Sequence, residues 1–180
     1  VGYVINDAKG YEDENGPRLV MTPWYSEPIP FIEAAEIGTE KVIKEHSTIG
    51  IVVTTDGSIG DIPRSEYIEA EKTVIEELSA VGKPYIVLLN STHPMLPDTE
   101  SLANKLKEEY KVPVLPISIE AMQERDMYNI LKEALYEFPI EQIKVNMPEW
   151  IAILSPDNYL KKEYISKIKE AVTEVNKLKD

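Results

Sequence analysis

Polar residues follow a buried-looking apolar run in the middle of the sequence. The segment Tyr85–Pro94 reads YIVLLNSTHP, so five apolar or aromatic residues lead to Asn90 and a polar turn. In open α/β sheets ligands bind at the carboxyl ends of strands, and an asparagine there can hydrogen-bond a nucleotide base. Asparagine at the end of a strand is also a common turn former. Asn90 therefore has two interpretations, a contact to a ligand and the start of a turn.

A second polar turn follows an earlier β-branched run. Thr48–Thr54 reads TIGIVVT, which is typical of a strand buried on both faces. The turn that follows, TTDGSIGD over Thr54–Asp61, places Asp56 at the carboxyl end of that strand. A carboxylate there is geometrically able to approach a ligand at the sheet edge. The pattern assigns it no more specific role.

Strand-like and helix-like segments alternate through residues 48–138. Apolar residues recur at intervals of three and four in the helix-like segments, and the strand-like segments are short and apolar. The expected elements are a helix over Phe31–His46, a strand over Thr48–Thr54, a helix over Ser65–Val81, a strand over Tyr85–Asn90, a helix capped by Asp98, a strand over Val112–Ser118 and a helix over Arg125–Phe138. Such alternation predicts an α/β fold with a parallel sheet and right-handed crossovers.

The last quarter of the chain has a different pattern. Residues 138–160 alternate short apolar stretches with three prolines, which indicates a linker or an irregular strand pair. Apolar residues then recur at intervals of four and three, namely Tyr164, Ile168, Ala171, Val175 and Leu178. This spacing predicts an amphipathic helix, docked on its own domain in the simpler interpretation and paired in a short coiled coil in the other. We place a domain boundary near Pro148, between residues 1–147 and residues 148–180.

Composition disfavours several classes of function. The 180 residues suffice for one domain and part of another, and their net charge of −13 disfavours a broad nucleic-acid or anionic-membrane surface. No cysteine is present, which excludes disulfides and thiolate metal sites and fits a reducing cytoplasm. No apolar run approaches the roughly 20 residues of a transmembrane helix, and the first residues lack the features of a signal peptide.

No complete catalytic constellation is visible in the sequence. The eight glycines do not form the G-x-x-x-x-G-K-[ST] loop whose backbone N–H groups bind phosphate. A nucleophile elbow is absent as well, and His46 and His93 are far apart and lack neighbours that suggest metal ligation. Taken alone, the residues do not specify an activity.

Three long segments of the sequence resemble a known family. They are residues 10–67, which begin GYEDENGPRLV, residues 81–94, VGKPYIVLLNSTHP, and residues 133–151, EALYEFPIEQIKVNMPEWI. On these segments the chain resembles, over essentially its whole length, the stage IV sporulation protein A family of morphogenetic ATPases at the base of the bacterial spore coat. The resemblance implies an α/β ATPase domain with the three-layer parallel sheet of the P-loop GTPase-like (translation-factor) type. Its amino-terminal strands would lie upstream of residue 1, and the start of an α+β middle region would follow it.

The resemblance also implies where ATP binds. Val1-Gly2-Tyr3 looks like the end of an Asp-x-x-Gly motif, so the backbone N–H of Gly2 is expected to meet the γ-phosphate. The P-loop lysine, the Mg²⁺-binding hydroxyl and the aspartate of the motif are then expected upstream of residue 1. ATP and Mg²⁺ are thus implied as cofactors of the complete protein, and this chain on its own is expected to be inactive.

The turn after Asn90 would correspond to the base-reading motif of GTP-binding relatives, Asn-Lys-x-Asp. Here the motif reads Asn90-Ser91-Thr92-His93, so the aspartate that accepts two hydrogen bonds from guanine is missing. Guanine selection should be lost, since donors left unpaired in such a site cost about 1–3 kcal/mol. The resemblance makes Asn90 an ATP-binding residue, with the turn former as the competing interpretation. It makes Ser118 a neighbour of the base, with helix capping as the competing interpretation.

The function implied by the resemblance is that of a cytoskeletal ATPase. ATP hydrolysis would drive polymerisation into the basement layer of the spore coat, on the outer forespore membrane in the mother-cell cytoplasm. The expected partners are further copies of the protein, and, through regions outside this chain, spore coat proteins and a small membrane-bound coat peptide; no nucleic acid is expected. The alternative is a non-catalytic structural scaffold that assembles through surface contacts, and composition does not separate the two.

Two loops near the start carry conspicuous side chains. The acidic run Tyr11–Asn15 is interpreted as a solvated loop in preference to a Mg²⁺ site, because charge runs usually face solvent. Trp24 and Tyr25 lie between prolines in TPWYSEPIP and either pack internally or form a contact between subunits. Internal packing is the favoured interpretation.

Overall fold

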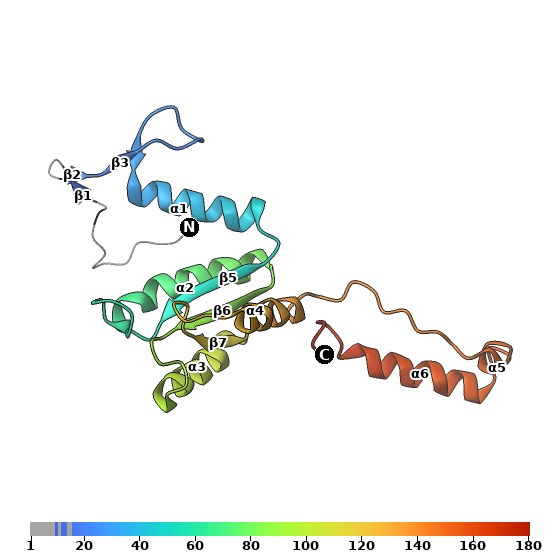
Figure 1. Cartoon of the computed structure of the whole chain (residues 1–180). Helices are drawn as coiled ribbons and strands as arrows, with labels where there is room; N and C mark the ends of the chain where they lie inside the picture. The colour runs from blue at the N-terminus through green and yellow to red at the C-terminus, as the bar shows by residue number, and fades with distance from the viewer. Residues whose placement is uncertain (1–9, 11, 14–15) are drawn as a thin grey trace. The chain divides into compact units, whose positions relative to one another are not determined.

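The computed structural model describes residues 10, 12–13 and 16–180. The chain forms two compact units, Val1–Ala134 and Leu135–Asp180. The change in sequence pattern had placed the domain boundary further along, near Pro148. The first unit contains a three-stranded sheet with its helices, and the second contains the last two helices (Figure 1).

A parallel sheet forms the centre of the first unit. Its strands are β5 (Gly50–Thr55), β6 (Tyr85–Asn90) and β7 (Val114–Ile117), in the order β5-β6-β7. Thr55 pairs with Asn90 and Asn90 pairs with Ile117, so the three strands end at the same edge. The predicted α/β fold with a parallel sheet is confirmed.

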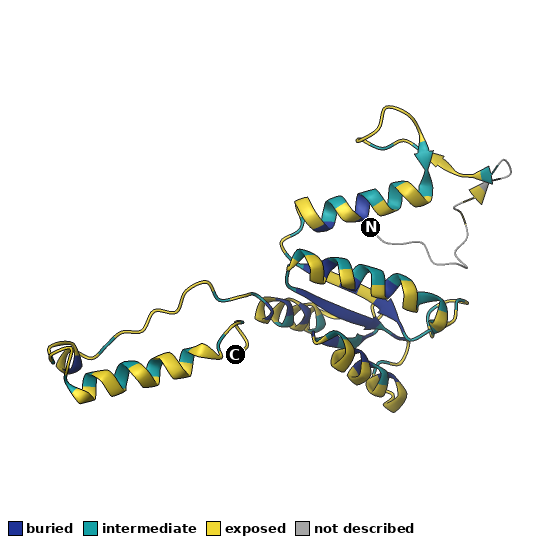
Figure 2. Cartoon of the chain, turned by 180° about the vertical axis from the view of Figure 1, so that it is seen from behind, coloured by how far each residue is buried: buried dark blue, intermediate teal, exposed yellow. Residues whose placement is uncertain are grey.

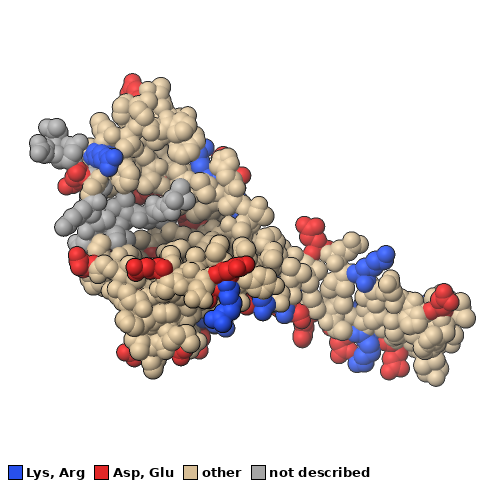
Figure 3. Space-filling view, in the orientation of Figure 1, with Lys and Arg blue, Asp and Glu red and all other residues tan. Residues whose placement is uncertain are grey.

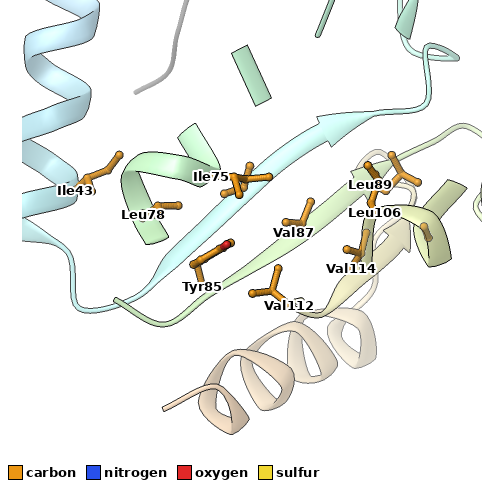
Figure 4. Close-up of a cluster of buried hydrophobic side chains, with 11 residues drawn as sticks. Ile43, Ile75, Leu78, Tyr85, Val87, Leu89, Leu106, Val112 and Val114 are labelled. Atoms are coloured by element: carbon orange, nitrogen blue, oxygen red, sulfur yellow. The ribbon is translucent and has the colours of Figure 1, made fainter. Parts of the chain in front are cut away.

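Helices lie on both faces of this sheet. They are α2 (Arg64–Val81) between β5 and β6, α3 (Pro97–Tyr110) between β6 and β7, and α4 (Glu124–Tyr136) after β7. Side chains of α2 and α3 form one buried cluster with alternate residues of the strands (Figure 4). The intervening strand residues point to the other face of the sheet and form a second cluster with side chains of α4. The crossovers therefore place α2 and α3 on one face and α4 on the other.

The central strand β6 is buried on both faces. Tyr85, Val87 and Leu89 pack in the cluster with α2 and α3, whereas Ile86 and Leu88 pack with α4. None of the five is more than 6% exposed, and Figure 2 shows the strands as the most deeply buried part of the chain. A strand of this kind needs apolar side chains at successive positions. That is why the run YIVLL identified it in the sequence.

The outer strand β5 is buried on one face only. Val52 is buried in the cluster with α2, but Ile51 and Val53 are 45% and 56% exposed. They pair with Ile86 and Leu88 of β6, so they lie on the α4 face of the sheet. Among the described strands, β5 pairs only with β6. We refer to Ile51, Val53 and the outer edge of β5 as the open flank.

One predicted helix cap is wrong. Helix α3 begins at Pro97 with Leu96 at the N-cap position and no side-chain cap, so Asp98 lies inside the first turn. Proline is favoured at the first helical position because its fixed φ suits a helix and its missing N–H has no partner there. In the first turn the Asp98 carboxylate still interacts favourably with the helix dipole.

Two short hairpins and a helix precede the sheet. Strand β1 (Glu12–Asp13) pairs with β2 (Gly16–Pro17), β3 (Leu19–Val20) pairs with β4 (Ile29–Pro30), and α1 (Phe31–Lys41) continues into a π-helical turn, η1 (Val42–His46). The helix predicted over Phe31–His46 is thus present, with a wider last turn. Lys83 Nζ donates to the carbonyl oxygens of Ile43 and Lys44, at 2.6 and 2.9 Å, and so stabilises this turn.

The two early loops differ in how much of them is described. Glu12 and Asp13 of the acidic run form β1, while Tyr11, Glu14 and Asn15 lie outside the described residues. The Trp24 ring packs over Gly38 of α1, where an added Cβ would lie 3.6 Å from it. Lys41 Nζ lies 5.8 Å from the centre of the same ring. Trp24 therefore contacts α1 of its own chain, although the side chain remains 43% exposed.

The second unit contains two helices, α5 (Glu149–Ala152) and α6 (Tyr159–Thr173). Asn158 caps α6, because its Oδ1 accepts a hydrogen bond from the backbone N–H of Leu160 at 3.0 Å. None of the described α6 residues is buried (Figure 2). Whether this helix docks or pairs stays a prediction.

The end of the predicted last helix is wrong. Helix α6 stops at Thr173, so Val175 and Leu178 lie outside it. Residues 176–178 instead pair with residues 138–140: Ile140 N–H donates to the Asn176 carbonyl, and Leu178 N–H donates to the Phe138 carbonyl, each at 3.0 Å. The backbone groups that would continue the helix are used in this antiparallel pairing.

Candidate functional site

The polar residues found at strand ends in the sequence come together at one edge of the sheet. Asp56 directly follows β5, Asn90 ends β6 and Ser118 directly follows β7. The backbone N–H of Asp56 donates to the Asn90 carbonyl at 3.3 Å, and that of Ser91 donates to the Ile117 carbonyl at 2.9 Å. We call Asp56, Asn90, Ser118 and the turns that follow them the polar edge.

Asn90 connects the ends of β6 and β7. Its side-chain Oδ1 accepts a hydrogen bond from the backbone N–H of Ile119 at 3.0 Å. Ile119 follows Ser118 in the turn after β7, so the Asn90 side chain holds that turn in place. The bond uses only the carbonyl half of the Asn90 amide. Its NH₂ group can still donate a hydrogen bond to a ligand.

Ser118 lies in the same turn and has a local role. Its Oγ accepts from the backbone N–H of Ala121 at 3.4 Å. Helix α4 begins later, at Glu124, so Ser118 stabilises the turn ahead of the helix and does not cap the helix itself. Ser118 thus lies close to Asn90, because the next residue, Ile119, is hydrogen-bonded to the Asn90 side chain. The Ser118 hydroxyl itself makes an ordinary turn-forming hydrogen bond.

Asp56 receives hydrogen bonds from separate segments of the chain. Its Oδ1 accepts from the backbone N–H of Ser58 at 2.9 Å and also from the Ser58 hydroxyl. Its Oδ2 accepts from Thr99 Oγ1, in the first turn of α3, at 3.2 Å. Burial raises the pKa of Asp56, but hydrogen bonds from Ser58, Ser91 and Thr99 outweigh it and hold the pKa below its ordinary value. The carboxylate is therefore ionised at neutral pH.

The turn after β6 is held by the same hydroxyl groups. Ser58 Oγ accepts from the backbone N–H of Thr92 at 2.9 Å, and Ser91 Oγ accepts from the backbone N–H of His93 at 3.0 Å. Ser91 is buried, with 1% of its surface exposed, whereas Thr92 and His93 are exposed. His93 Nδ1 lies 2.9 Å from Thr92 Oγ1. His93, which the resemblance aligns with the guanine-reading aspartate, thus has a solvent-accessible imidazole.

A buried ionic network lies next to the polar edge. Arg64 donates to both carboxylate oxygens of Glu71, at 2.6 and 2.8 Å, and to Thr54 Oγ1 at 2.8 Å. The hydroxyl of Tyr110 on α3 donates to Glu71 Oε1 at 2.7 Å. Burial raises the pKa of Glu71, but the bonds from Arg64, Thr54 and Tyr110 outweigh it and lower the pKa. The network fixes α2 against β5 and α3.

Sequence reasoning found part of this arrangement and missed the rest. Asp56 was identified from its place after a strand, and Ser58 two residues later has the spacing of an Asx turn. Thr99 lies 43 residues from Asp56, and no local pattern connects the two. The Arg64–Glu71 pair had no distinguishing signal either, since its spacing of seven residues is not one of the i,i+3 or i,i+4 spacings that indicate a helical ion pair.

The described residues do not provide a metal centre. Among them, no group of three His, Cys, Asp or Glu side chains is placed to hold a metal ion. Gly2, the residue expected beside the γ-phosphate, lies outside the described residues.

In the part of the chain that the structure describes, no helix is both long and apolar enough to cross a membrane. On the face shown in Figure 3, acidic and basic side chains are interspersed in small groups.

Comparison with known proteins identifies the family. The model of the stage IV sporulation protein A ATPase domain matches residues 1–139, and that of the middle domain of the same protein matches residues 140–180. The chain belongs to the stage IV sporulation protein A family. The two matched domains of this family meet between residues 139 and 140, near the division between the two compact units.

Individual members of the stage IV sporulation protein A family match the whole chain. Over all 180 residues it is 57% identical to stage IV sporulation protein A of Bacillus subtilis (strain 168), 55% identical to that of Bacillus anthracis and 43% identical to that of Clostridioides difficile (strain 630). The chain spans 37% of the length of each of these relatives. No solved structure matches it.

Proposed function

We propose that this chain is the carboxyl-side part of an ATPase domain with the start of the middle domain, and that the complete protein hydrolyses ATP to polymerise. The match to a domain described as an ATPase domain over residues 1–139 supports nucleotide binding. The observation that carries the proposal is the polar edge, where Asn90 and the turn after β7 meet at the carboxyl ends of parallel strands. Nucleotides bind at this edge in open α/β sheets.

The open flank supports a P-loop GTPase-like arrangement. Ile51 and Val53 are β-branched side chains exposed on a strand whose outer edge is unpaired among the described strands. Exposed edges of this kind are normally paired or covered in folded proteins. In the proposal, strands that precede this chain in the complete protein pair with β5 and carry the phosphate-binding loop.

Asn90 would contact the adenine base through its amide NH₂ group. The Oδ1 atom is held by Ile119, which fixes the orientation of the side chain before ATP arrives. His93 stands where GTP-binding relatives have the guanine-reading aspartate, so no carboxylate in this turn pairs with guanine. Ser118 would lie beside the base, because it belongs to the turn that the Asn90 side chain holds in place.

The described residues bind neither the phosphates nor Mg²⁺ in this proposal. Gly2 and the segments ahead of it would supply those contacts in the complete protein. The described part of the chain contains no metal-ligating cluster, so we assign no Mg²⁺ ligand within it. Its contribution is to position the base and to support the strands that carry the phosphate site.

The wider role extends this proposal. We propose that the polymer forms the basement layer of the spore coat on the outer forespore membrane, in the mother-cell cytoplasm. The partners would be further copies of the protein and, through regions outside this chain, spore coat proteins and a small membrane-bound coat peptide. A non-catalytic scaffold is the alternative outcome that an experiment must distinguish.

The experiment compares this chain with the complete protein of the same organism. The complete protein should release phosphate from ATP and sediment as a polymer only when ATP is present, whereas the isolated chain should do neither. A non-hydrolysable ATP analogue serves as the control for hydrolysis. ATP turnover by the isolated chain would contradict the proposal that segments outside this chain are needed to bind the phosphates. Sedimentation of the complete protein without ATP binding would favour the scaffold.

A further inference from the structure

The turn after β6 is held in part by a side chain from outside it. The backbone N–H of Thr92 donates to Ser58 Oγ, which belongs to the turn after β5, at 2.9 Å. Thr92 and His93 are exposed, so little packing restrains them. A short exposed turn keeps one conformation only where specific hydrogen bonds restrain it.

Asp56 is the centre of these restraints. Its carboxylate accepts from Ser58 on its own turn and from Thr99 on α3. The Ser58 hydroxyl that donates to Asp56 also accepts from Thr92 N–H, so Asp56 restrains the turn after β6 through Ser58. One carboxylate therefore connects three separate segments.

We propose that Asp56 is a positioning residue that fixes the conformation of residues 91–93 and thereby holds this turn in place beside the bound adenine base. This rests on the proposed function, in which Asn90 and the turn that follows it form the base site. Asp56 itself does not touch the nucleotide. It acts through Ser58.

The chemistry of the cluster explains why a carboxylate is needed. A carboxylate accepts several hydrogen bonds at once, and bonds to a charged acceptor are roughly twice as strong as neutral ones. An amide in place of the carboxylate preserves part of the cluster, because hydroxyl groups can rotate and accept from it.

The test uses the complete protein with Asp56→Ala and Asp56→Asn. The Asp56→Ala variant should raise hydrogen exchange of the Thr92 and His93 amides about tenfold or more and raise KM for ATP about tenfold, with kcat nearly unchanged. Asp56→Asn should fall between this variant and the wild type in both measurements. Asp126→Ala is the matched control, because the Asp126 carboxylate has the same intermediate burial as Asp56 and also accepts a local backbone bond, from Gln123 N–H at 3.0 Å, but outside the cluster. It should change neither quantity.

Several outcomes overturn the assignment. Unchanged exchange of the two amides in Asp56→Ala would show that the carboxylate does not restrain the turn. Faster exchange with an unchanged KM would show that the turn it restrains does not serve the nucleotide site. If Asp56→Ala fails to fold, Thr99→Val removes one bond to the carboxylate and leaves the Ser58–Thr92 bond in place, and the same two readouts apply. Failure of the proposed function is distinguishable, because then the wild-type protein itself would not bind ATP.

Discussion

The Oδ1 atom of Asn90 accepts a hydrogen bond from the backbone N–H of Ile119 at 3.0 Å, across 29 residues of sequence. The bond gives Asn90 a structural role at the ends of two neighbouring strands. It does not exclude a role in binding, because the amide has a second half that this bond does not use. A substitution that keeps the Oδ1 acceptor but removes the NH₂ donor can therefore decide whether Asn90 contacts a ligand or only forms a turn.

Asn90→Asp is that substitution. Aspartate still accepts from the Ile119 N–H but has no amide donor, so the turn should persist with stability within about 0.5 kcal/mol of wild type. If the NH₂ group binds the base, KM for ATP in the complete protein should rise about tenfold. Asn90→Ala, which loses both halves, serves as the comparison and should also loosen the Ile119 amide in hydrogen exchange. A wild-type KM in Asn90→Asp would leave Asn90 as a turn former only.

The Arg64–Glu71 pair should give the first unit a pH-dependent stability. The pKa of Glu71 is lower in the folded state than its ordinary value of 4.5. The stabilisation is thus fully present above about pH 4.5 and is lost as the pH falls through the lower folded-state pKa. Glu71→Gln should cost about 3 kcal/mol at neutral pH, because it leaves the partly buried Arg64 without its counter-ion. The difference from wild type should shrink in acid.

Native-state hydrogen exchange of the β5 and α2 amides in the complete protein measures this effect, at neutral pH and near pH 3.5. Glu69→Gln on the same helix removes an exposed carboxylate and should stay within about 0.5 kcal/mol of wild type. Tyr110→Phe should cost about 1 kcal/mol, since it removes one hydrogen bond to Glu71. A Glu71→Gln deficit that is equal at both pH values would show that ionisation of Glu71 does not stabilise the unit.

Gly57 and Gly60 offer a matched pair in the turn after β5. Both have positive φ, +90° and +73°, but an added Cβ at Gly57 would lie 2.8 Å from the backbone nitrogen of Arg64, whereas nothing lies within 4 Å at Gly60. Gly60→Ala should cost about 1 kcal/mol from the backbone conformation alone. Gly57→Ala should cost clearly more, and should displace Arg64 and lower protection of the α2 amides. Equal costs for the two variants would mean that the close approach to Arg64 is not maintained in solution.

The sequence predicted those parts of the fold that depend on local pattern. The run over Tyr85–Asn90 identified a central strand with the observed bounds, because burial on both faces requires apolar residues at successive positions. Strand ends pointed to Asp56 and Asn90, because parallel strands end at one edge, and the resemblance added Ser118. The resemblance identified the family.

The rest depended on contacts between distant segments. The last helix ends at Thr173, before its apolar spacing ends, because residues 176–178 pair with residues 138–140. Two contacts illustrate this, that of Asp56 with Thr99 and that of Glu71 with Tyr110. Thr99 and Tyr110 both lie on α3, and they reach these carboxylates only when the crossovers place α2 and α3 on one face of the sheet. Spacing along the chain does not contain this information.

The second unit should depend on Glu137. Its side chain is 1% exposed and accepts from Lys177 Nζ at 2.5 Å and Lys179 Nζ at 2.7 Å. Burial raises the pKa of Glu137, but the hydrogen bonds and charges of the two lysines outweigh it and lower the pKa. The carboxylate thus remains ionised and fastens residues 177–179 to the segment after α4.

Glu137→Ala should release this segment. It removes the buried acceptor of two partly exposed ammonium groups, so the pairing of residues 138–140 with residues 176–178 should weaken by about 1–2 kcal/mol. In the complete protein the Ile140 and Leu178 amides, which donate across this pairing, should then exchange much faster. Glu170→Ala is the control, because its pair with Lys167 is exposed and should be worth less than about 1 kcal/mol. Equal protection of the Ile140 and Leu178 amides in the two variants would show that backbone pairing alone closes the unit.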